Sequence, residues 1–461
     1  MMGDPPNQQG QFLYNFNLDD LIPEDHLLRQ IDQVLDLSTL RTHLAPFYSH
    51  TGRPSIDPEL MLRMLLIGYC YGIRSERRLC EEVRLNLAYR WFCRLSIEDP
   101  VPDHSTFSKN RHGRFRDSDT LRFVFERVLH RCMAEGLVGG EGFAIDASII
   151  KADVNRRRHR EDDDDDWGSG GSNRAVREYL QALETSNPGS GKPAKRISPT
   201  DPGARYTAAI YGAPHYAYST NYLVDVTAGV IVDVEATPCY RPAELASART
   251  MVERVEARMG LKPRRLIGDT AYGTAELLAW MVDEKGIEPH MPLWEKSERQ
   301  DGTFSRSAFN YNPNQDRYTC PGGKHLYPRR RKFKQLRSLV TQENTIIYRA
   351  LSADCGMCAM KERCCPNTPM RKVVRSVHEE ARDVVRKLQD TPAFAQSRKQ
   401  RKKVEMLFGH LKRILKLDRL RLRGLSGAHD EFILAATAQN LRRMAKYLSQ
   451  GPPVMPATMP A

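Results

Sequence analysis

The spacing of apolar residues divides the chain into a helical first part, a mixed middle part and a helical end. Over the first ~135 residues apolar positions recur every three or four residues, which is the period of an amphipathic helix. From about residue 140 short apolar runs such as "GFAIDASIIKADV", "HYAYSTNYLVDVT" and "GVIVDVEATP" predict strands. Helical spacing returns from about residue 373 and runs to about residue 449.

Turn and capping residues predict where these elements begin and end. Asp57 is the expected N-cap of a helix that begins at Pro58. Ala228-Gly229 is a plausible hairpin turn between two strands, and Gly260 is the expected C-cap of the helix that follows them. A strand ending at Asp269 and a further helix come next. Strands that give way to strand–helix alternation predict a mixed α/β domain.

The segment "RKKVEMLFGHLKRILKL", residues 401–417, has two distinct helical faces. Arg401, Glu405 and Lys412 share one face, and Gly409 lies between them, where a bare backbone would let a ligand come close. An i,i+4 ion pair on a solvated helix is the simpler explanation of Glu405. The apolar stripe that would face a core consists of Val404, Leu407, Phe408, Leu411, Ile414 and Leu415.

A second basic segment, "PVPDHSTFSKNRHGRFR", has the order turn, cap and short helix. Asp103 or Ser105 would be the cap, and the basic residues that follow are Lys109, Arg111, Arg114 and Arg116. This order is typical of a helix-turn-helix reader of the DNA major groove. It is equally that of an ordinary helical bundle with a solvated basic edge, and both interpretations stay open.

The amino-acid composition indicates which class of molecule the protein binds. Lys and Arg outnumber Asp and Glu by 70 to 57, and the excess gathers at Arg329–Lys334 and Arg398–Arg423, which favours nucleic acid. The start carries no secretory signal pattern, and no apolar run approaches the length of a membrane span. We therefore expect a soluble intracellular protein with no membrane partner. The Pro-rich end, residues 450–461, is expected to be disordered.

Three acids form the first candidate metal site. Asp146 and Asp269 each follow an apolar run, so both are expected at or just past the C-terminal end of a strand, where α/β sheets bind ligands. Glu405 projects from a helix that could pack on the same sheet. Three hard oxygen ligands suit Mg²⁺ or Mn²⁺, and two such ions can drive phosphodiester cleavage. Other acids are given simpler roles: Asp225 and Asp233 as solvent-facing or turn residues, and the five-Asp run as a solvated loop.

A cysteine set forms the second candidate. Cys355 and Cys358 make a C-x2-C pair, Cys364 and Cys365 follow, and Cys320 lies upstream in "YTCPGGK". Cys320, Cys355, Cys358 and Cys364 would hold a tetrahedral Zn²⁺ and fold an insertion that lacks an apolar core. Reduced thiols without a metal are the alternative. The remaining cysteines of the helical region, Cys70, Cys80, Cys93 and Cys132, are expected in the core.

At this point the sequence resembles the DDE transposases of bacterial insertion sequences, in the branch whose last acid lies in an Arg-x3-Glu-x6-Lys box. That box corresponds to Arg401, Glu405 and Lys412. "AIDASIIKADVN" is similar to the family's first-Asp region and "IGDTAYGT" to its second. "LDDLIPEDHLLRQID", "GRPSIDPELMLRMLLIGYCYGIRSERRL" and "DHSTFSKNR" are similar to its N-terminal helical domain.

The resemblance implies a fold, an activity and a set of roles. Asp146, Asp269 and Glu405 would hold two Mg²⁺ or Mn²⁺ ions for DNA cleavage and strand transfer at terminal inverted repeats. Arg401 and Lys412 would contact the DNA, both the element's ends and the target. Apart from the resemblance, the basic helix after Asp103 predicts Lys109 and Arg111 as further contacts to double-stranded DNA, and the cysteine spacing predicts a structural Zn²⁺. A homodimer in the bacterial cytoplasm, associated with the nucleoid, would form the active complex.

The expected fold class is α/β, with an RNase H-like mixed-sheet catalytic core, an all-helical DNA-binding domain and a Cys-rich insertion. Its expected parts are the helical DNA-binding domain (1–135), the first part of the core (136–295), the Cys-rich inserted subdomain (296–370), the C-terminal helices of the core with Glu405 (371–449) and the tail (450–461).

Two departures from the family pattern keep other functions open. In the family the Arg-x3-Glu-x6-Lys box is usually preceded, three residues before the Arg, by a Tyr, where this chain has Arg398. Relatives also usually carry a Lys in the second strand, and the corresponding segment here, "AIYGAPHYAYSTNYLVDV", has none. A decayed or domesticated transposase acting as a DNA-binding protein is one alternative. A non-transposing RNase H-like nuclease is the other.

Overall fold

The chain forms two compact units in the computed structural model. The first comprises Met1–Lys262 with Lys402–Ala461, and the second Pro263–Arg401. The five expected domain limits stay predictions. The five-Asp run, the Pro-rich tail and most of the Arg329–Lys334 cluster lie outside the described residues. The structure describes residues 17–49, 51, 55–155, 157, 173–185, 196–208, 213–293, 301–329 and 338–450.

The first unit begins with the predicted helical region. Asp57 caps α4 by accepting from the N–H of Glu59, and Asp103 caps α7 by accepting from the N–H of Ser105, so Asp103 is the cap rather than Ser105. The elements are α1 (Leu18–Leu21), α2 (Leu27–Val34), α3 (Leu40–Leu44), η1 (Ala45–Phe47), α4 (Pro58–Cys70), α5 (Glu76–Leu85), α6 (Leu87–Phe92), α7 (His104–His112), α8 (Arg114–Asp117) and α9 (Thr120–Ala134).

The sheet of the first unit is built around its longest strand. β3 (His215–Asp225) pairs antiparallel with β1 (Gly142–Lys151) on one side, and with β2 (Arg205–Thr207) and then β4 (Ile231–Pro238) on the other. The predicted turn joins β3 to β4, and Gly229 there takes a φ of +72°, which favours glycine. The sequence placed Asp146 at the end of its strand, which is wrong, because β1 continues to Lys151.

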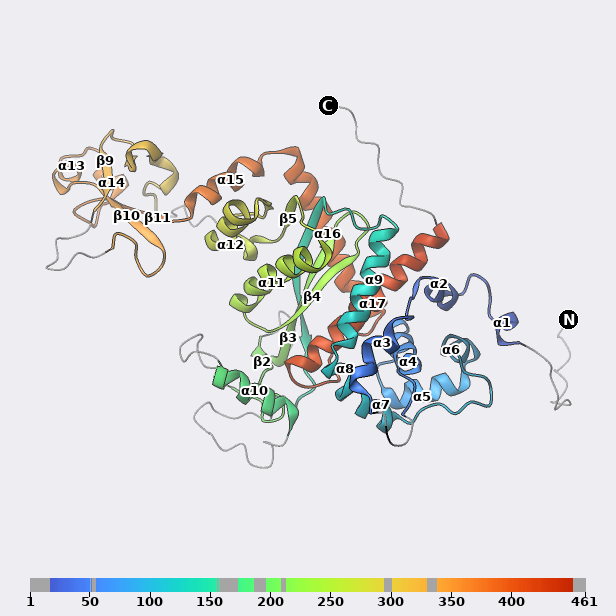
Figure 1. Ribbon diagram of the computed structural model, residues 1–461. Coiled ribbons are helices and arrows are strands. Elements are labelled where there is room, and N and C mark those ends of the chain that lie inside the picture. Colours follow the sequence, from blue (N-terminus) through green and yellow to red (C-terminus); the bar gives the residue numbers. More distant parts are fainter. Residues whose placement is uncertain are drawn as a thin grey trace, which may run out of the picture. The chain divides into compact units, whose positions relative to one another are not determined.

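Helices cover both faces of this sheet (Figure 1). Tyr222 and Leu223 are neighbours on β3, so their side chains point to opposite faces. The Phe408 ring of α16 (Pro392–Arg413) packs 5.5 Å from the Tyr222 ring. On the other face Asp233, which pairs with Leu223, accepts from Arg254 of α11 (Arg241–Met259) at 2.8 Å. The remaining helices are α10 (Arg174–Thr185) and α17 (Leu425–Gln450), and α17 contacts α9 and β4.

The second unit holds a parallel strand pair and a separate antiparallel sheet. β5 (Arg265–Ile267) runs parallel to β6 (Glu288–His290), with η3 (Thr270–Tyr272), α12 (Ala275–Ala279) and the π-helix η4 (Trp280–Lys285) between them. The five-stranded sheet has the order β11-β10-β9-β8-β7. Its elements and the helix after it are η5 (Arg306–Ala308), β7 (Asn310–Asn312), η6 (Pro313–Gln315), β8 (Arg317–Thr319), β9 (His325–Pro328), β10 (Thr345–Arg349), α13 (Ser352–Gly356), α14 (Lys361–Cys364), β11 (Lys372–Ser376) and α15 (Glu379–Gln389).

Two expectations about this second unit are corrected. Helical structure was expected from about residue 373, but residues 372–376 form strand β11, and α15 begins at Glu379. The Cys-rich segment was expected to lack an apolar core, yet its sheet encloses one, in which Phe309, Leu326, Tyr348 and Val373 are buried. The mixed α/β fold class and the N-terminal helical region are confirmed.

Candidate active site

Asp146 lies in the middle of β1 on the face that α16 covers. Its Cα partner on β3 is Tyr222, and residues directly opposite each other in an antiparallel pair project from the same face of the sheet. Because the Phe408 ring of α16 packs on the Tyr222 ring, the Asp146 side chain is directed toward that helix. Its carboxylate accepts a hydrogen bond from the N–H of Ala147 at 2.8 Å and is partly exposed.

Two lysines anchor α16 along this strand. Lys403 Nζ donates to the carbonyl oxygen of Val226 at 2.8 Å, and the N–H of Val226 donates to the carbonyl of Gly142, the first residue of β1, at 3.1 Å. Near the other end of the strand Lys412 Nζ donates to the carbonyl oxygen of Ile149 at 3.2 Å. Partial burial lowers the pKa of the Lys412 ammonium. The helix therefore follows β1 between these two contacts.

Glu405 and Asp146 both fall between the two lysine anchors. Asp146 lies between the anchored ends of β1, and Glu405 lies between Lys403 and Lys412 on the helix. The apolar stripe of α16 faces the core as predicted at Val404, Leu407, Phe408, Leu411 and Leu415, whereas Ile414 is 48 % exposed. Within the first unit, Asp146 is thus directed toward α16, the helix that carries Glu405.

Asp269 belongs to the second unit, at the carboxyl end of β5 as predicted. One residue, Gly268, separates it from the strand, and its carboxylate accepts from the N–H of Ala271 at 2.8 Å, which caps η3. A Cβ at Gly268 would lie 3.2 Å from the Met291 side chain, so a larger residue before Asp269 would disturb the strand end. Joining Asp269 to the other two acids is part of the proposed function.

The other box residues are placed as follows. A Cβ built on Gly409 would have no atom within 4 Å, so the space beside this residue is open. Arg401 is the last residue of the second unit, and both Arg401 and Glu405 already interact with neighbouring groups.

The predicted DNA-reading helix, α7, has fewer solvent-exposed cations than the sequence predicted. Lys109 is exposed. Arg111 is buried and forms an ion pair with Glu76 of α5, so its guanidinium holds two helices together. Of the predicted contacts in this helix only Lys109 faces solvent.

The next two arginines are also engaged internally. Arg114 stacks over the Tyr48 ring, with its guanidinium carbon 4.3 Å from the ring centroid, and Arg116 donates to Asp430 at 2.5 Å. These contacts correspond to a helical bundle more than to a row of cations presented to DNA.

Sequence reasoning missed a buried charge cluster on the other face of the sheet. Asp233 was expected to face solvent but is 1 % exposed and is paired with Arg122 of α9 as well as Arg254. Burial and these two arginines lower the pKa of the adjacent His429 to about 3. In "GVIVDVEATP" Asp233 alternates with apolar residues, which is the pattern of a strand with one face in water. Nothing in that pattern indicated that helices would cover both faces of the strand and supply two arginines to the acid.

Asp225 was expected to be a solvent-facing or turn acid, and it is a turn acid. Its carboxylate accepts from the N–H groups of Thr227 at 2.8 Å and Gly139 at 3.2 Å, and the side chain is fully buried. It fixes the β3–β4 turn and takes no part in the face that carries Asp146.

The four predicted cysteine ligands all lie in the second unit. Cys364 is buried in the core of its sheet, and Cys320 and Cys355 pack against that core. Cys365, which the zinc prediction left out, is buried in the same core. Within the described ranges no three His, Cys, Asp or Glu side chains are already gathered closely enough to hold a metal ion.

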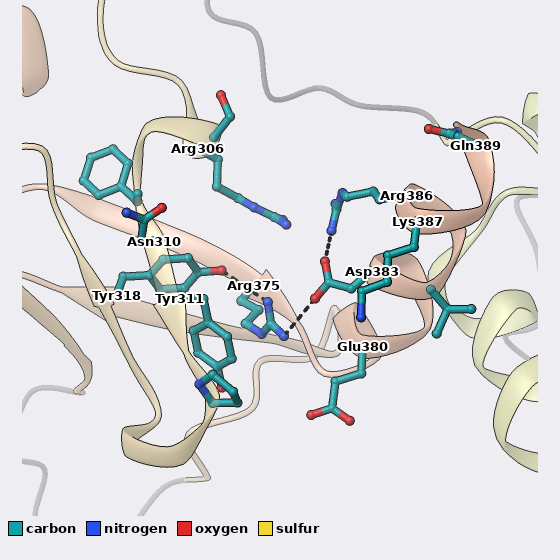
Figure 2. Close-up of a pocket in the computed structure, with 14 residues that line it drawn as sticks. Arg306, Asn310, Tyr311, Tyr318, Arg375, Glu380, Asp383, Arg386, Lys387 and Gln389 are labelled. Atoms are coloured by element: carbon teal, nitrogen blue, oxygen red, sulfur yellow. Dashed lines mark hydrogen bonds and ion pairs between the residues drawn. The ribbon is translucent and has the colours of Figure 1, made fainter. Parts of the chain in front are cut away.

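A cavity of about 780 Å³ lies between the sheet of the second unit and α15 (Figure 2). Figure 2 shows Arg375 between the Tyr311 ring, 3.8 Å from its guanidinium carbon, and Asp383 at 3.6 Å. Asp383 also pairs with Arg386. Three of the arginines around this cavity are held by acids, so the charges mainly fix the sheet against α15.

The buried acid beside this cavity is Glu379. Burial would raise the pKa of Glu379, but hydrogen bonds from Arg306 and Arg386 outweigh it and hold the pKa at about 2. Glu379 therefore stays ionised and serves as the anchor of the cluster.

Comparison with known families gives two matches. Residues 16–113 match the family described as Transposase domain (DUF772), and residues 319–445 match the one described as Transposase DDE domain. The second match contains Glu405, the Arg401–Lys412 box and the cysteine set, whereas Asp146 and Asp269 lie between the two matched segments. Of the helices that the structure describes, none is both long and apolar enough to cross a membrane.

Proposed function

We propose, from the matches to two transposase families, that this chain is a DDE transposase that cuts and joins DNA at the terminal inverted repeats of an insertion sequence. The observation that supports the proposal is that Asp146 is directed toward α16, and that two lysines of this helix, on either side of Glu405 in sequence, donate to backbone carbonyls near the two ends of β1.

Asp146, Glu405 and, from the second unit, Asp269 would hold two Mg²⁺ or Mn²⁺ ions. Carboxylate oxygens are the hard ligands that these ions prefer, and the three side chains fit that requirement chemically. The ions, when bound, activate the attacking oxygen and stabilise the leaving oxygen of phosphodiester cleavage. The protein's own part is to hold the carboxylates in position, which the packing of Phe408 on Tyr222 and the two lysine anchors support.

The cations of the box would contact the DNA backbone. Lys412 lies at the same stretch of β1 as Asp146, and Arg401 lies one helical turn before Glu405. Both would hold phosphates of double-stranded DNA, at the element's ends and at the target. In the N-terminal region Lys109 is retained as a contact, and Arg111 is not, because its guanidinium is buried against Glu76. Cutting two ends in one complex requires two active sites, so the working form would be a homodimer.

The test is cleavage of a DNA duplex that carries the inverted repeat, with Mg²⁺ or Mn²⁺. Asp146→Asn, Asp269→Asn and Glu405→Gln should each reduce cleavage to background while binding of the duplex is kept, because each removes one metal ligand and no phosphate contact. Glu284→Gln, an exposed acid in the second unit, is the matched control and should cut normally.

The alternatives give different results. A protein that binds the repeat but never cuts it would be a decayed transposase acting as a DNA-binding protein. Cleavage without joining of the cut end to a target would identify a nuclease. Cutting by Glu405→Gln at the normal rate would overturn the assignment of the acids.

A further inference from the structure

The second unit carries five thiols in one neighbourhood, outside the proposed active site. Cys320 lies in the turn after β8, Cys355 lies in α13, Cys358 follows it, and the vicinal pair Cys364–Cys365 ends α14. All five are free thiols. The proposed DNA chemistry uses none of them, so their grouping needs its own explanation.

The turn around Cys320 is folded toward its sulfur. The N–H of Lys324 donates to Cys320 Sγ at 3.3 Å, and the N–H of Cys320 donates back to the Lys324 carbonyl at 2.8 Å. Gly323, with a φ of +76°, closes the turn. These two hydrogen bonds hold the Cys320 sulfur in a fixed position within the turn.

Cys358 lies against the same turn. A Cβ at Gly322 would lie 3.6 Å from Cys358 Sγ and 3.7 Å from Cys320 Sγ. Both sulfurs therefore border the same small space beside Gly322, within van der Waals contact of where a Cβ would lie. The turn brings one thiol of the upstream segment to one thiol of the C-x2-C pair.

Cys355 joins this pair to the vicinal cysteines. Cys320 and Cys355 both pack against the small apolar core in which Cys364 and Cys365 are buried. Cys355 also lies three residues before Cys358, in the same C-x2-C pair. The folded sheet therefore brings together the upstream turn, the C-x2-C pair and the vicinal cysteines.

We propose that Cys320, Cys355, Cys358 and one thiol of the vicinal pair Cys364–Cys365 bind a single Zn²⁺. Two ligands come from the C-x2-C pair, one from the glycine turn, and the fourth from the end of α14. Among the described residues these cysteines are not already gathered around one point. Binding of Zn²⁺ would have to draw the four sulfurs to about 2.3 Å from the ion.

A bound Zn²⁺ would cross-link the segments that carry the cysteines, but the small sheet would not depend on it for folding. The sheet already has an apolar core of Phe309, Leu326, Tyr348 and Val373. Zinc should therefore raise the stability of the unit, and its removal should leave the unit folded. This separates the proposal from a zinc finger, in which the metal supplies the core's role.

The test uses the full-length protein purified without chelator, and it measures zinc per chain by elemental analysis. Wild type should hold one zinc, and Cys355→Ser, Cys358→Ser and the double variant Cys364→Ser/Cys365→Ser should each lose it. Cys239→Ser, a cysteine outside the group, is the matched control and should keep it. After exchange for Co²⁺, wild type should show the charge-transfer absorption of cobalt bound to thiolates.

The single variants of the vicinal pair decide the fourth ligand. One of Cys364→Ser and Cys365→Ser should keep zinc and the other should lose it, or both should keep it if either thiol can serve. Loss of zinc from both single variants would overturn the proposal, as would zinc retained by the double variant. Wild-type protein without zinc, or with a disulfide among these cysteines in its place, would also overturn it. None of these results depends on DNA cleavage.

Discussion

Asp201 is a buried carboxyl group that no candidate function uses. It accepts hydrogen bonds from the Tyr218 hydroxyl at 2.5 Å and from the N–H of Gly424 at 3.1 Å. Burial raises its pKa from 3.8 to about 6, and these hydrogen bonds only partly oppose the rise. Between pH ~4 and ~6 the folded protein therefore holds a proton that the unfolded chain has released.

The first prediction follows from the sign of this difference. The free energy of unfolding of wild type should fall as pH rises from about 4 to about 6, by roughly 3 kcal/mol from this group alone. Asp201→Asn, which cannot ionise, should lack that fall and be more stable than wild type at pH 7. Urea unfolding at a series of pH values measures both. An unchanged pH slope in the variant would show that Asp201 does not titrate in this range.

Gly409 gives a second prediction at the residue scale. Gly409→Ala should stabilise α16 by about 0.5–1 kcal/mol, because alanine favours a helix and its Cβ would meet no neighbour. If DNA approaches the bare backbone between Glu405 and Lys412, the same change should weaken cleavage of repeat DNA. Met406→Ala, on the exposed side of the same helix, is the control. Full activity in the stabilised glycine variant would exclude close approach at this position.

At the scale of elements, two kinds of ion pair hold the sheet of the first unit to what surrounds it. Asp233 on β4 is buried between Arg122 of α9 and Arg254 of α11. Asp153, just after β1, pairs with Arg419 at 3.1 Å and with Arg423 at 3.4 Å, but its side chain remains 31 % exposed. Both acids have two arginine partners, and they differ mainly in burial.

The third prediction compares these two acids. Asp233→Asn should lower the free energy of unfolding by about 3–5 kcal/mol, because it leaves the buried Arg122 without its counter-charge. Asp153→Asn should cost no more than about 1 kcal/mol, because water screens that pair. Urea unfolding of the two variants at pH 7 gives the comparison. Equal losses would mean that burial does not decide the value of these pairs.

At the scale of the whole molecule, the two compact units should respond differently to acid. In the first unit, the contribution of Asp201 to the free energy of unfolding is larger at lower pH. Glu379 in the second unit has its pKa held at about 2 by arginines, so its contribution is complete above pH ~4 and is lost as pH falls toward 2. The side chain is 1 % exposed, so solvent screens this cluster little.

The fourth prediction is therefore a pH-dependent order of loosening. As pH falls from 4 to 2, strands β10 and β11 of the second unit should lose protection from hydrogen exchange, after correction for the intrinsic rate. Glu379→Gln should produce that loss already at neutral pH, while β3 and β4 of the first unit stay protected. Equal loosening of both units would contradict separate control by Glu379.

Much of the local structure could be read from the chain. The Asp57 cap, the turn at Gly229, the end of α11 at Gly260 and the apolar stripe of residues 404–415 all follow from short-range chemistry. All are confirmed except Ile414 of the stripe, which is exposed. The failures have a different origin. The continuation of β1 past Asp146, strand β11 and the burial of Asp233 depend on partners distant in sequence.

For the candidate site, the sequence determined which side chains are suited to metal and phosphate, because residue type and spacing fix charge, ligand hardness and helical face. The tertiary structure decided which of them share a surface. It directed Asp146 toward α16, the helix of Glu405, buried Arg111 against Glu76, and added Cys365 to the thiols. Long-range pairing chooses the neighbours of each side chain, and no local pattern contains that choice.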